Sequence, residues 1–206
     1  MPIRILIVDD HPALRAGLNA LLSNEEDMEV IAEAATGDEG VAMFLRHRPD
    51  IVLMDLRLPG LGGVDAILAI RAKDPAARII VNTTYDADED IYRALQSGAS
   101  SYLLKDMFKE EIFAAIRSVH AGHAVLPSQV AQRLSERLRR PELTSRELAV
   151  LELLTKGRSN KEIADDLAIS EDTVKFRLKG LFSKLGVPDR TAAVVSAVRH
   201  GIVHLE

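Results

Sequence analysis

The sequence predicts two structural classes in one chain: an α/β fold with a five-stranded, doubly wound parallel sheet, and after it a small all-α domain. Apolar runs of the length of buried parallel strands alternate with stretches of helical period through residue 120. Beyond residue 140 the strand-like runs stop, and four short helical segments follow. The charge balance changes too, because residues 1–120 hold 12 Lys and Arg against 20 Asp and Glu, whereas residues 121–206 hold 14 against 11. An acidic half followed by a mildly basic half favours two domains with different partners.

The segment between the two halves is predicted to be a linker that is partly helical. Residues 121–140 contain Gly122 and Pro127 and end in an arginine-rich stretch before Pro141. We expect one helix within it, over residues 128–138. The predicted domains are therefore residues 1–120 and 141–206, which suits the length of the chain.

Four apolar runs of the first domain lead into polar side chains. The runs are Ile5–Val8, Ile51–Met54, Ile79–Val81 and Tyr102–Leu104, and they lead to Asp9 with Asp10, to Asp55, to Thr83 and to Lys105. Ligands of open parallel sheets bind outside the carboxyl ends of the strands, so we expect these groups to converge at one edge. Three carboxylates held together repel one another unless a cation joins them. The pattern predicts a magnesium site that receives a phosphoryl group.

Each residue of this set has a chemical role in that interpretation. Asp55 is the candidate nucleophile, since a carboxylate accepts a phosphoryl group to form an aspartyl phosphate. Asp9, Asp10 and Asp55 offer the hard oxygen ligands that magnesium prefers. Lys105 would bind one phosphoryl oxygen and Thr83 another. Taken singly, these residues are equally typical of a helix cap, a surface lysine and a strand former, so the prediction depends on their occurrence together.

Helical stretches separate the strands, and helix caps are clear in the second half. The stretches of the first half are residues 12–22, 38–47, 62–73, 87–97 and 108–119. In the second half, Thr144 with Glu147 and Ser159 with Glu162 form capping boxes. Ser170 is placed to cap a helix that ends at Gly186, only a tight turn after the preceding helix. Two short helices across a tight turn predict a helix-turn-helix, whose second helix enters the DNA major groove.

Composition excludes several classes of protein. The chain has no cysteine, which rules out disulfides and thiolate catalysis and fits a reducing cytoplasm. It has no apolar run long enough to span a bilayer and no amino-terminal signal pattern. We therefore expect a cytoplasmic protein with no membrane partner.

The motifs of both halves resemble one known family. Residues 3–120 are similar to the receiver domain of two-component response regulators, in the acidic pair Asp9-Asp10, in Asp55 followed by Pro59 and Gly63, in Thr83-Thr84 and in the segment from Gly98 to Lys105. Residues 143–200 resemble the LuxR-type helix-turn-helix domain, in Leu143-Thr144-x-Arg146-Glu147, in Ser159–Ala164, in Thr173-Val174-Lys175 and in Lys184–Val187. Together they resemble a full-length response regulator of the NarL/FixJ type.

The resemblance implies a fold, a function and partners. It implies a flavodoxin-like receiver in which a partner histidine kinase phosphorylates Asp55, with Mg²⁺ held by Asp9, Asp10, Asp55 and the backbone carbonyl of Arg57. It implies a switch in which Thr83 moves and Tyr102 swings inward. The active form would be a homodimer that binds double-stranded promoter DNA at paired half-sites and regulates transcription.

The resemblance also assigns candidate DNA contacts. Lys175, Phe176 and Lys179 occupy positions that face base edges, where lysine favours guanine and Phe176 a thymine methyl group. Thr173, Arg177, Lys161 and Lys184 are expected to contact phosphates. Without the surrounding motif, these basic residues would be an ordinary solvated helix face.

Three positions depart from the family pattern. Asp106 follows Lys105 where many other receivers have a cis proline, so we expect a trans bond here. Asn82 replaces an apolar strand residue and is expected to perturb the fourth strand. Arg177 stands where this helix of the family usually carries a histidine, and Phe176 beside it is large and apolar, which affects sequence preference.

Two other functions remain open from the residues alone. A phosphatase of the haloacid dehalogenase type also uses an aspartate nucleophile at a strand end, but it needs an acid two residues later, where this chain has Arg57. The other alternative is a DNA-binding protein whose receiver domain works without phosphorylation. Arg57 argues against the enzyme, and the complete acidic set argues against a receiver that works without phosphorylation, so a regulator controlled by phosphorylation is the favoured prediction.

Overall fold

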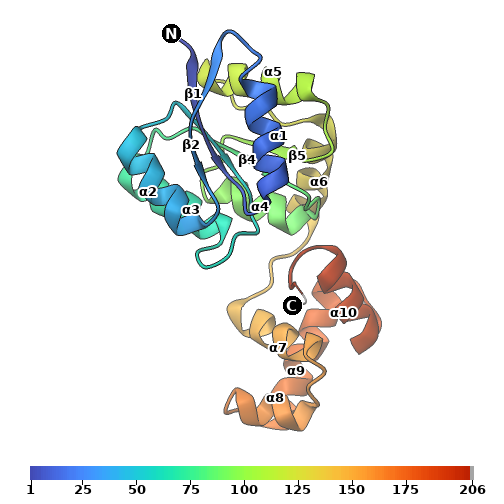
Figure 1. Cartoon of the computed structure of the whole chain (residues 1–206). Helices are drawn as coiled ribbons and strands as arrows, with labels where there is room; N and C mark the ends of the chain where they lie inside the picture. Colours follow the sequence, from blue (N-terminus) through green and yellow to red (C-terminus); the bar gives the residue numbers. More distant parts are fainter. Residues whose placement is uncertain (205–206) are drawn as a thin grey trace. The chain divides into compact units, whose positions relative to one another are not determined.

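The computed structural model describes residues 1–204 and contains two compact units (Figure 1). The first unit comprises residues 1–86 and 91–132, and the second comprises residues 87–90 and the chain from Arg133 onward. Residues 205 and 206, which end the predicted second domain, lie outside the described residues.

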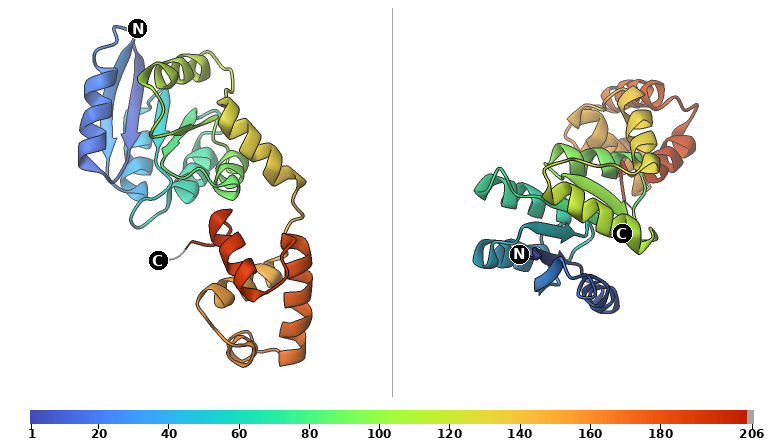
Figure 2. Two further views of the ribbon diagram at one scale, coloured as in Figure 1. Left: turned by 90° about the vertical axis from the view of Figure 1, so that its right-hand side faces the viewer. Right: turned by 90° about the horizontal axis from the view of Figure 1, so that it is seen from above.

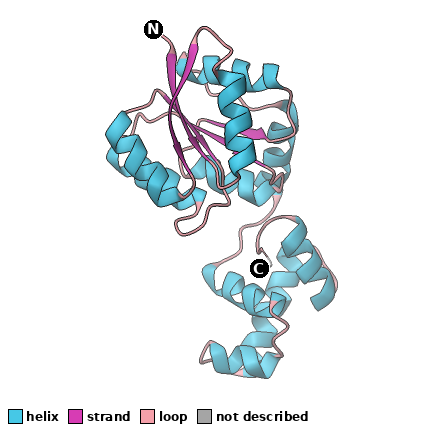
Figure 3. Cartoon of the chain, in the orientation of Figure 1, coloured by secondary structure: helices cyan, strands magenta, loops and turns pink. Residues whose placement is uncertain are grey.

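The first unit is built on the parallel five-stranded sheet that the sequence predicted (Figure 3). Its strands are β1 (Ile3–Val8), β2 (Met28–Ala34), β3 (Ile51–Met54), β4 (Ile79–Thr83) and β5 (Ser101–Leu104). They lie in the order β2-β1-β3-β4-β5, and all neighbours are parallel. The fold class of this half is therefore confirmed.

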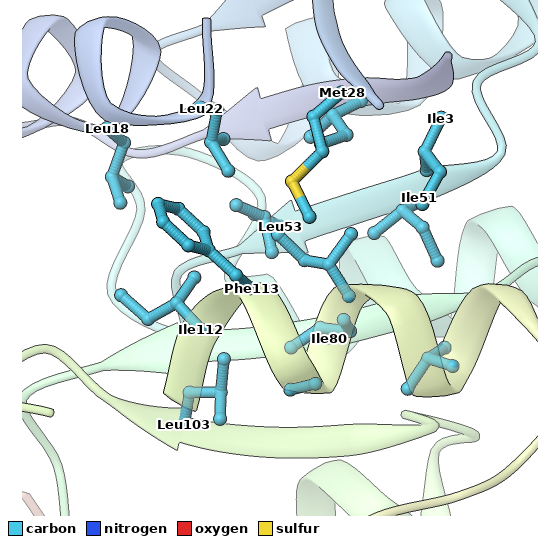
Figure 4. Close-up of a cluster of buried hydrophobic side chains, with 14 of the residues drawn as sticks. Ile3, Leu18, Leu22, Met28, Ile51, Leu53, Ile80, Leu103, Ile112 and Phe113 are labelled. Carbon is cyan, nitrogen blue, oxygen red and sulfur yellow. The ribbon is translucent and has the colours of Figure 1, made fainter. Parts of the chain in front are cut away.

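Helices cover both faces of this sheet (Figure 2). They are α1 (Pro12–Leu22), α2 (Gly37–His47), α3 (Gly63–Lys73), α4 (Asp88–Gln96) and α5 (Lys109–His120). On one face, Phe113 of α5 packs with Leu18 of α1 against Leu53 and Ile80 of the central strands (Figure 4). This core holds the strands rigidly. The polar residues at their carboxyl ends therefore have defined positions at one edge of the sheet.

The central strands are buried on both faces, which explains their continuous apolar runs. Every residue of β3 is buried, whereas in β2, at the edge of the sheet, only the first and last residues are buried and the others are partly or fully exposed. Asn82 belongs to β4 and pairs with Leu103 in regular register, so the expected perturbation of this strand is not seen. The peptide bond between Lys105 and Asp106 is trans, as predicted.

The linker contains one helix, α6 (Ser128–Arg139), and the division into units falls inside it. Within the second unit, the Arg137 guanidinium near the end of α6 is buried, and its Nε lies 2.5 Å from Glu89 Oε2. This ion pair is one of the contacts that join residues 87–90 to the second part of the chain, together with those of Asp88 to Arg140 and His200.

The second unit contains the helices that the sequence predicted. They are α7 (Ser145–Thr155), α8 (Asn160–Asp166), α9 (Glu171–Leu185) and α10 (Arg190–Arg199). Thr144 and Ser159 form the two expected capping boxes, and Gly186 ends α9 in the left-handed conformation, with φ 65°. No helix in the described part of the chain has the length and apolar character needed to cross a bilayer.

Candidate functional site

Two buried carboxylates lie at the carboxyl edge of the sheet. Asp9 directly follows β1, and Asp55 follows the neighbouring strand β3, where its amide still donates to Val8 of β1. The residues are 2% and 3% exposed. Asp10, next in the chain, is partly exposed at the rim of the same site. The strand pairing of β1 and β3 therefore brings together the three acids that the sequence singled out.

Lys105 joins the two buried carboxylates. It follows β5, and its Nζ lies 2.6 Å from Asp9 Oδ2 and 2.6 Å from Asp55 Oδ2. Burial acts to lower the pKa of Lys105, but its hydrogen bonds to Asp55 and Asp9 outweigh burial, so the pKa lies above its ordinary value. The ammonium is therefore charged at neutral pH and lies against the Asp9 and Asp55 carboxylates.

The donor set fits a magnesium ion. Ligand atoms of Asp9, Asp10, His11 and Asp55 lie within 4.8 Å of one another. Three carboxylates opposed by one ammonium leave an excess of negative charge that a divalent cation would neutralise. Carboxylate oxygens are the ligands that Mg²⁺ prefers, and the partly exposed rim leaves room for the waters that it retains.

The loop after β3 holds Asp55 in place. Asp55 Oδ1 accepts hydrogen bonds from the backbone amides of Leu56, at 2.7 Å, and Arg57, at 3.4 Å. The chain returns so closely that an added Cβ on Gly63 would lie 2.1 Å from the Asp55 carbonyl oxygen. Only glycine fits this position without displacement of the loop. The Arg57 guanidinium lies over the Tyr85 ring, 4.6 Å from its centroid.

The predicted switch residues lie at the ends of β4 and β5. Thr83 is fully buried, and its Oγ1 accepts a hydrogen bond of 3.5 Å from the Tyr85 amide. Tyr102 is also fully buried, and its hydroxyl donates to the Tyr85 carbonyl at 2.7 Å. The Tyr102 ring is thus buried in this structure, and its swing into space that Thr83 vacates stays a prediction.

Sequence reasoning missed two residues near this site. His11 places a ring nitrogen among the acidic ligands, and Tyr85 connects Arg57, Thr83 and Tyr102. The position of His11 directly after the acidic pair was a signal in the sequence. Tyr85 carried no such signal, since its contacts come from three different segments.

The second unit holds a helix-turn-helix made by α8 and α9. Ala168 adopts a left-handed conformation, φ 51°, in the turn between them. Ser170 caps α9 by accepting from the Thr173 amide. Val174, Leu178 and Leu181 of α9 are buried in the core of this unit, so the opposite face of the helix is outward.

The outward face of α9 carries the predicted base-contacting residues. Lys175, Phe176 and Lys179 are exposed, and the Phe176 residue is 78% exposed although it is large and apolar. A groove beside Phe176 is lined by Thr173 and Arg177 of α9 and by residues at the start of α7, among them Arg146. Lys175 Nζ lies 3.0 Å from Asp172 Oδ1, and this hydrogen bond raises its pKa.

The residues predicted to contact phosphate have different surroundings. Lys161 is exposed on α8, and Thr173 and Arg177 are partly buried. Lys184 already binds within the unit: its Nζ lies 2.7 Å from Glu147 Oε2 and 3.0 Å from the Glu142 carbonyl. Lys184 thus connects the end of α9 to the capping box of α7.

Comparisons with known proteins identify the family. Residues 5–117 match the response regulator receiver domain, and residues 141–197 match the bacterial regulatory proteins of the luxR family. The chain is 41% identical over 210 residues to the transcriptional regulatory protein LiaR of Bacillus subtilis (strain 168), covering 98% of this chain and all of LiaR.

Solved structures with a similar fold come from the same family. The response regulator ChrA of a heme-sensing two-component system is 36% identical, with a TM-score of 0.60 over 98% of this chain and 99% of ChrA. The response regulator RcsB in complex with DNA is 25% identical, with a TM-score of 0.72 over 97% of this chain and 99% of RcsB. The chain therefore belongs to the NarL/FixJ-type response regulators, which are transcriptional regulators with a receiver domain and a LuxR-type DNA-binding domain.

Proposed function

We propose that phosphorylation of Asp55 by a partner histidine kinase controls promoter binding by this regulator. The observation that carries the proposal is Lys105, whose ammonium lies 2.6 Å from the carboxylates of both Asp9 and Asp55 at the edge of the sheet. A buried nucleophile, a second acid and a fixed cation suit phosphoryl transfer, which depends mainly on positioning and charge stabilisation.

The protein would contribute to phosphoryl transfer mainly by positioning groups and stabilising charge. An Asp55 carboxylate oxygen forms a bond to phosphorus while the bond from phosphorus to the kinase histidine breaks, and the imidazole leaves with the electron pair. Leu56 and Arg57 amides orient the Asp55 carboxylate, and Lys105 binds the incoming negative oxygens. Mg²⁺ held by Asp9, Asp10, Asp55 and the Arg57 carbonyl would offset charge on the phosphoryl oxygens.

Thr83 is the residue from which we expect the conformational signal to start. The Thr83 hydroxyl would donate to an oxygen of the phosphoryl group, and its Oγ1 at present accepts a hydrogen bond from the Tyr85 amide. Tyr85 also contacts Arg57 and Tyr102, so a change at Thr83 alters the loop that leads to α4.

DNA binding would use the outward face of α9. Lys175, Phe176 and Lys179 are exposed there and would contact base edges, while Lys161, Thr173 and Arg177 would contact phosphates. Lys184 would have to leave Glu147 to do the same. Val195 and Val198 are exposed on α10, and we propose them as part of a homodimer contact. A dimer would bind paired half-sites of double-stranded promoter DNA.

The test is the intact mass of the full chain after incubation with acetyl phosphate and Mg²⁺. We expect one phosphoryl adduct that requires Mg²⁺ and is absent from Asp55→Asn. The phosphorylated chain should also bind promoter DNA more tightly than the unphosphorylated chain and than Asp55→Asn, as measured by fluorescence anisotropy.

Other outcomes would favour the other functions. A folded chain that shows no adduct with acetyl phosphate or with kinases, yet binds DNA, would indicate a receiver that works without phosphorylation. Steady release of phosphate from small esters would indicate a phosphatase. We do not expect that release, because the position two residues after Asp55 is Arg57 and offers no general acid.

A further inference from the structure

We propose that His11 is a nitrogen ligand of the metal site, so that the site favours divalent transition-metal ions such as Mn²⁺ over Mg²⁺. The inference rests on the proposed metal site of Asp9, Asp10 and Asp55 and adds a fourth side chain to it. His11 Nδ1 lies 2.6 Å from Asp10 Oδ1 and 3.4 Å from Asp9 Oδ1. One nitrogen and three carboxylate oxygens therefore converge within 4.8 Å.

The His11 side chain does not cap the helix that it precedes. His11 is the N-cap residue of α1, where Ser, Thr, Asp or Asn would cap the helix, but its ring makes no capping hydrogen bond. Its backbone amide donates to Asp9 Oδ1 at 2.8 Å, which places the residue beside the acidic pair. Pro12 at the first helical position then fixes the direction in which the chain leaves.

The His11 ring lies against the Asp10 carboxylate. Asp10 Oδ1 is shielded from solvent and accepts no hydrogen bond within the described residues, although His11 Nδ1 is only 2.6 Å away. A cation held between His11 Nδ1 and Asp10 Oδ1 would have both atoms as ligands. The His11 side chain is 69% exposed, so an ion can reach it from solvent.

The dimensions of the set suit one ion. When an ion binds its ligands at about 2.1 Å, two ligands on opposite sides of it lie about 4.2 Å apart. The ligand atoms here lie within 4.8 Å of one another, so small side-chain rotations would bring them to that separation. Mg²⁺ prefers oxygen ligands and keeps its waters, whereas imidazole binds well to first-row transition metals. His11 therefore adds affinity for Mn²⁺ and little for Mg²⁺.

The experiment measures binding of Mg²⁺ and Mn²⁺, each alone, to the full unphosphorylated chain and to His11→Ala. We expect Mn²⁺ affinity to fall at least about tenfold in His11→Ala, since even indirect partners of a metal site contribute 10–100-fold. Mg²⁺ affinity should stay the same. Pulsed electron paramagnetic resonance of the bound Mn²⁺ should show coupling to an imidazole nitrogen in the wild type and none in His11→Ala.

A matched control is His120→Ala, which removes an exposed histidine at the end of α5 outside the acidic cluster. It should leave both affinities and the nitrogen coupling unchanged. Tight Mn²⁺ binding without nitrogen coupling in the wild type would overturn the role of His11 and leave the carboxylate site intact. Equal losses of Mg²⁺ and Mn²⁺ affinity in His11→Ala would also overturn it, because His11 would then only position Asp10. Failure of the wild type to bind either ion would contradict the metal site of the proposed function itself.

Discussion

At the scale of single residues, Asn82 is a polar side chain buried where an apolar one would fit. It is 3% exposed, and its Oδ1 has no hydrogen-bond partner among the described residues. It lies two residues after Ile80 on the same strand, so both side chains face the core beneath α1 and α5. We expect Asn82→Leu, which has a similar shape, to raise the free energy of unfolding by about 1–3 kcal/mol, because it removes a buried unsatisfied acceptor.

Tyrosine fluorescence during urea unfolding would measure this change. The chain has no tryptophan, and its three tyrosines, Tyr85, Tyr92 and Tyr102, all lie in the first half, so the signal reports on that part. Asn82→Ala is the control, since it removes the amide but leaves a cavity, and it should not stabilise the protein. A loss of stability in Asn82→Leu would mean that a buried water satisfies Oδ1.

At the scale of elements, the loop between β3 and α3 offers a matched pair of glycines. An added Cβ on Gly63 would lie 2.1 Å from the Asp55 carbonyl oxygen, whereas one on Gly62 would have no atom within 4 Å. We expect Gly63→Ala to displace Asp55, lower the yield of the phosphoryl adduct and reduce the free energy of unfolding by about 1–3 kcal/mol. Gly62→Ala should retain the adduct, and intact mass and urea unfolding would check both. Equal behaviour of the two variants would show that the loop adjusts freely.

Glu147, at the start of α7, makes the stability of the second unit depend on pH. Burial acts to raise the pKa of Glu147, but its bonds to Lys184 and Thr144 outweigh burial, and the pKa lies below its ordinary value. A carboxylate with a lowered pKa stabilises the fold above its unfolded pKa, and this contribution disappears as pH falls through the folded pKa.

We therefore expect Glu147→Gln to destabilise the second unit at neutral pH, with a difference from the wild type that shrinks in acid. Hydrogen exchange of the α7 amides, followed by mass spectrometry from neutral to acidic pH, would measure it. Glu152→Gln on the exposed face of the same helix is the control and should change little. A difference that is independent of pH would indicate that the Glu147 charge has no role.

At the scale of the whole molecule, the sequence predicted the helices and strands better than it predicted the side-chain contacts between them. The runs that became β1, β3, β4 and β5 are buried on both faces and therefore continuous, whereas β2 was not singled out because it is a half-exposed edge strand with Glu29 and Glu33. Parallel strand order explains why Asp9, Asp55 and Lys105 meet. Side-chain direction was not predictable: the buried ring of Tyr102 and the bond of Lys184 to Glu147 depend on elements that are distant in the sequence.

DNA binding by the full chain should distinguish residues that specify the base sequence from residues that only add affinity. A lysine that neutralises one phosphate releases one counterion, whereas an apolar ring against a base releases none. For the phosphorylated protein, Lys161→Ala should weaken binding to all sequences alike and reduce the slope of log affinity against log salt by about 1. Phe176→Ala should leave this slope unchanged and relax the preference for thymine at one position of the half-site.

Anisotropy titrations over a range of salt concentrations, on operator variants with one base changed at a time, would measure both effects. Lys156→Ala, which removes an exposed lysine at the end of α7 instead, is the control for a general loss of charge. If Phe176→Ala lowers affinity equally for all sequences and keeps the base preference, the exposed ring stabilises the helix and does not contact a base. Because α9 presents Phe176 and its lysines on one outward face, the same experiment tests whether that face lies in the major groove.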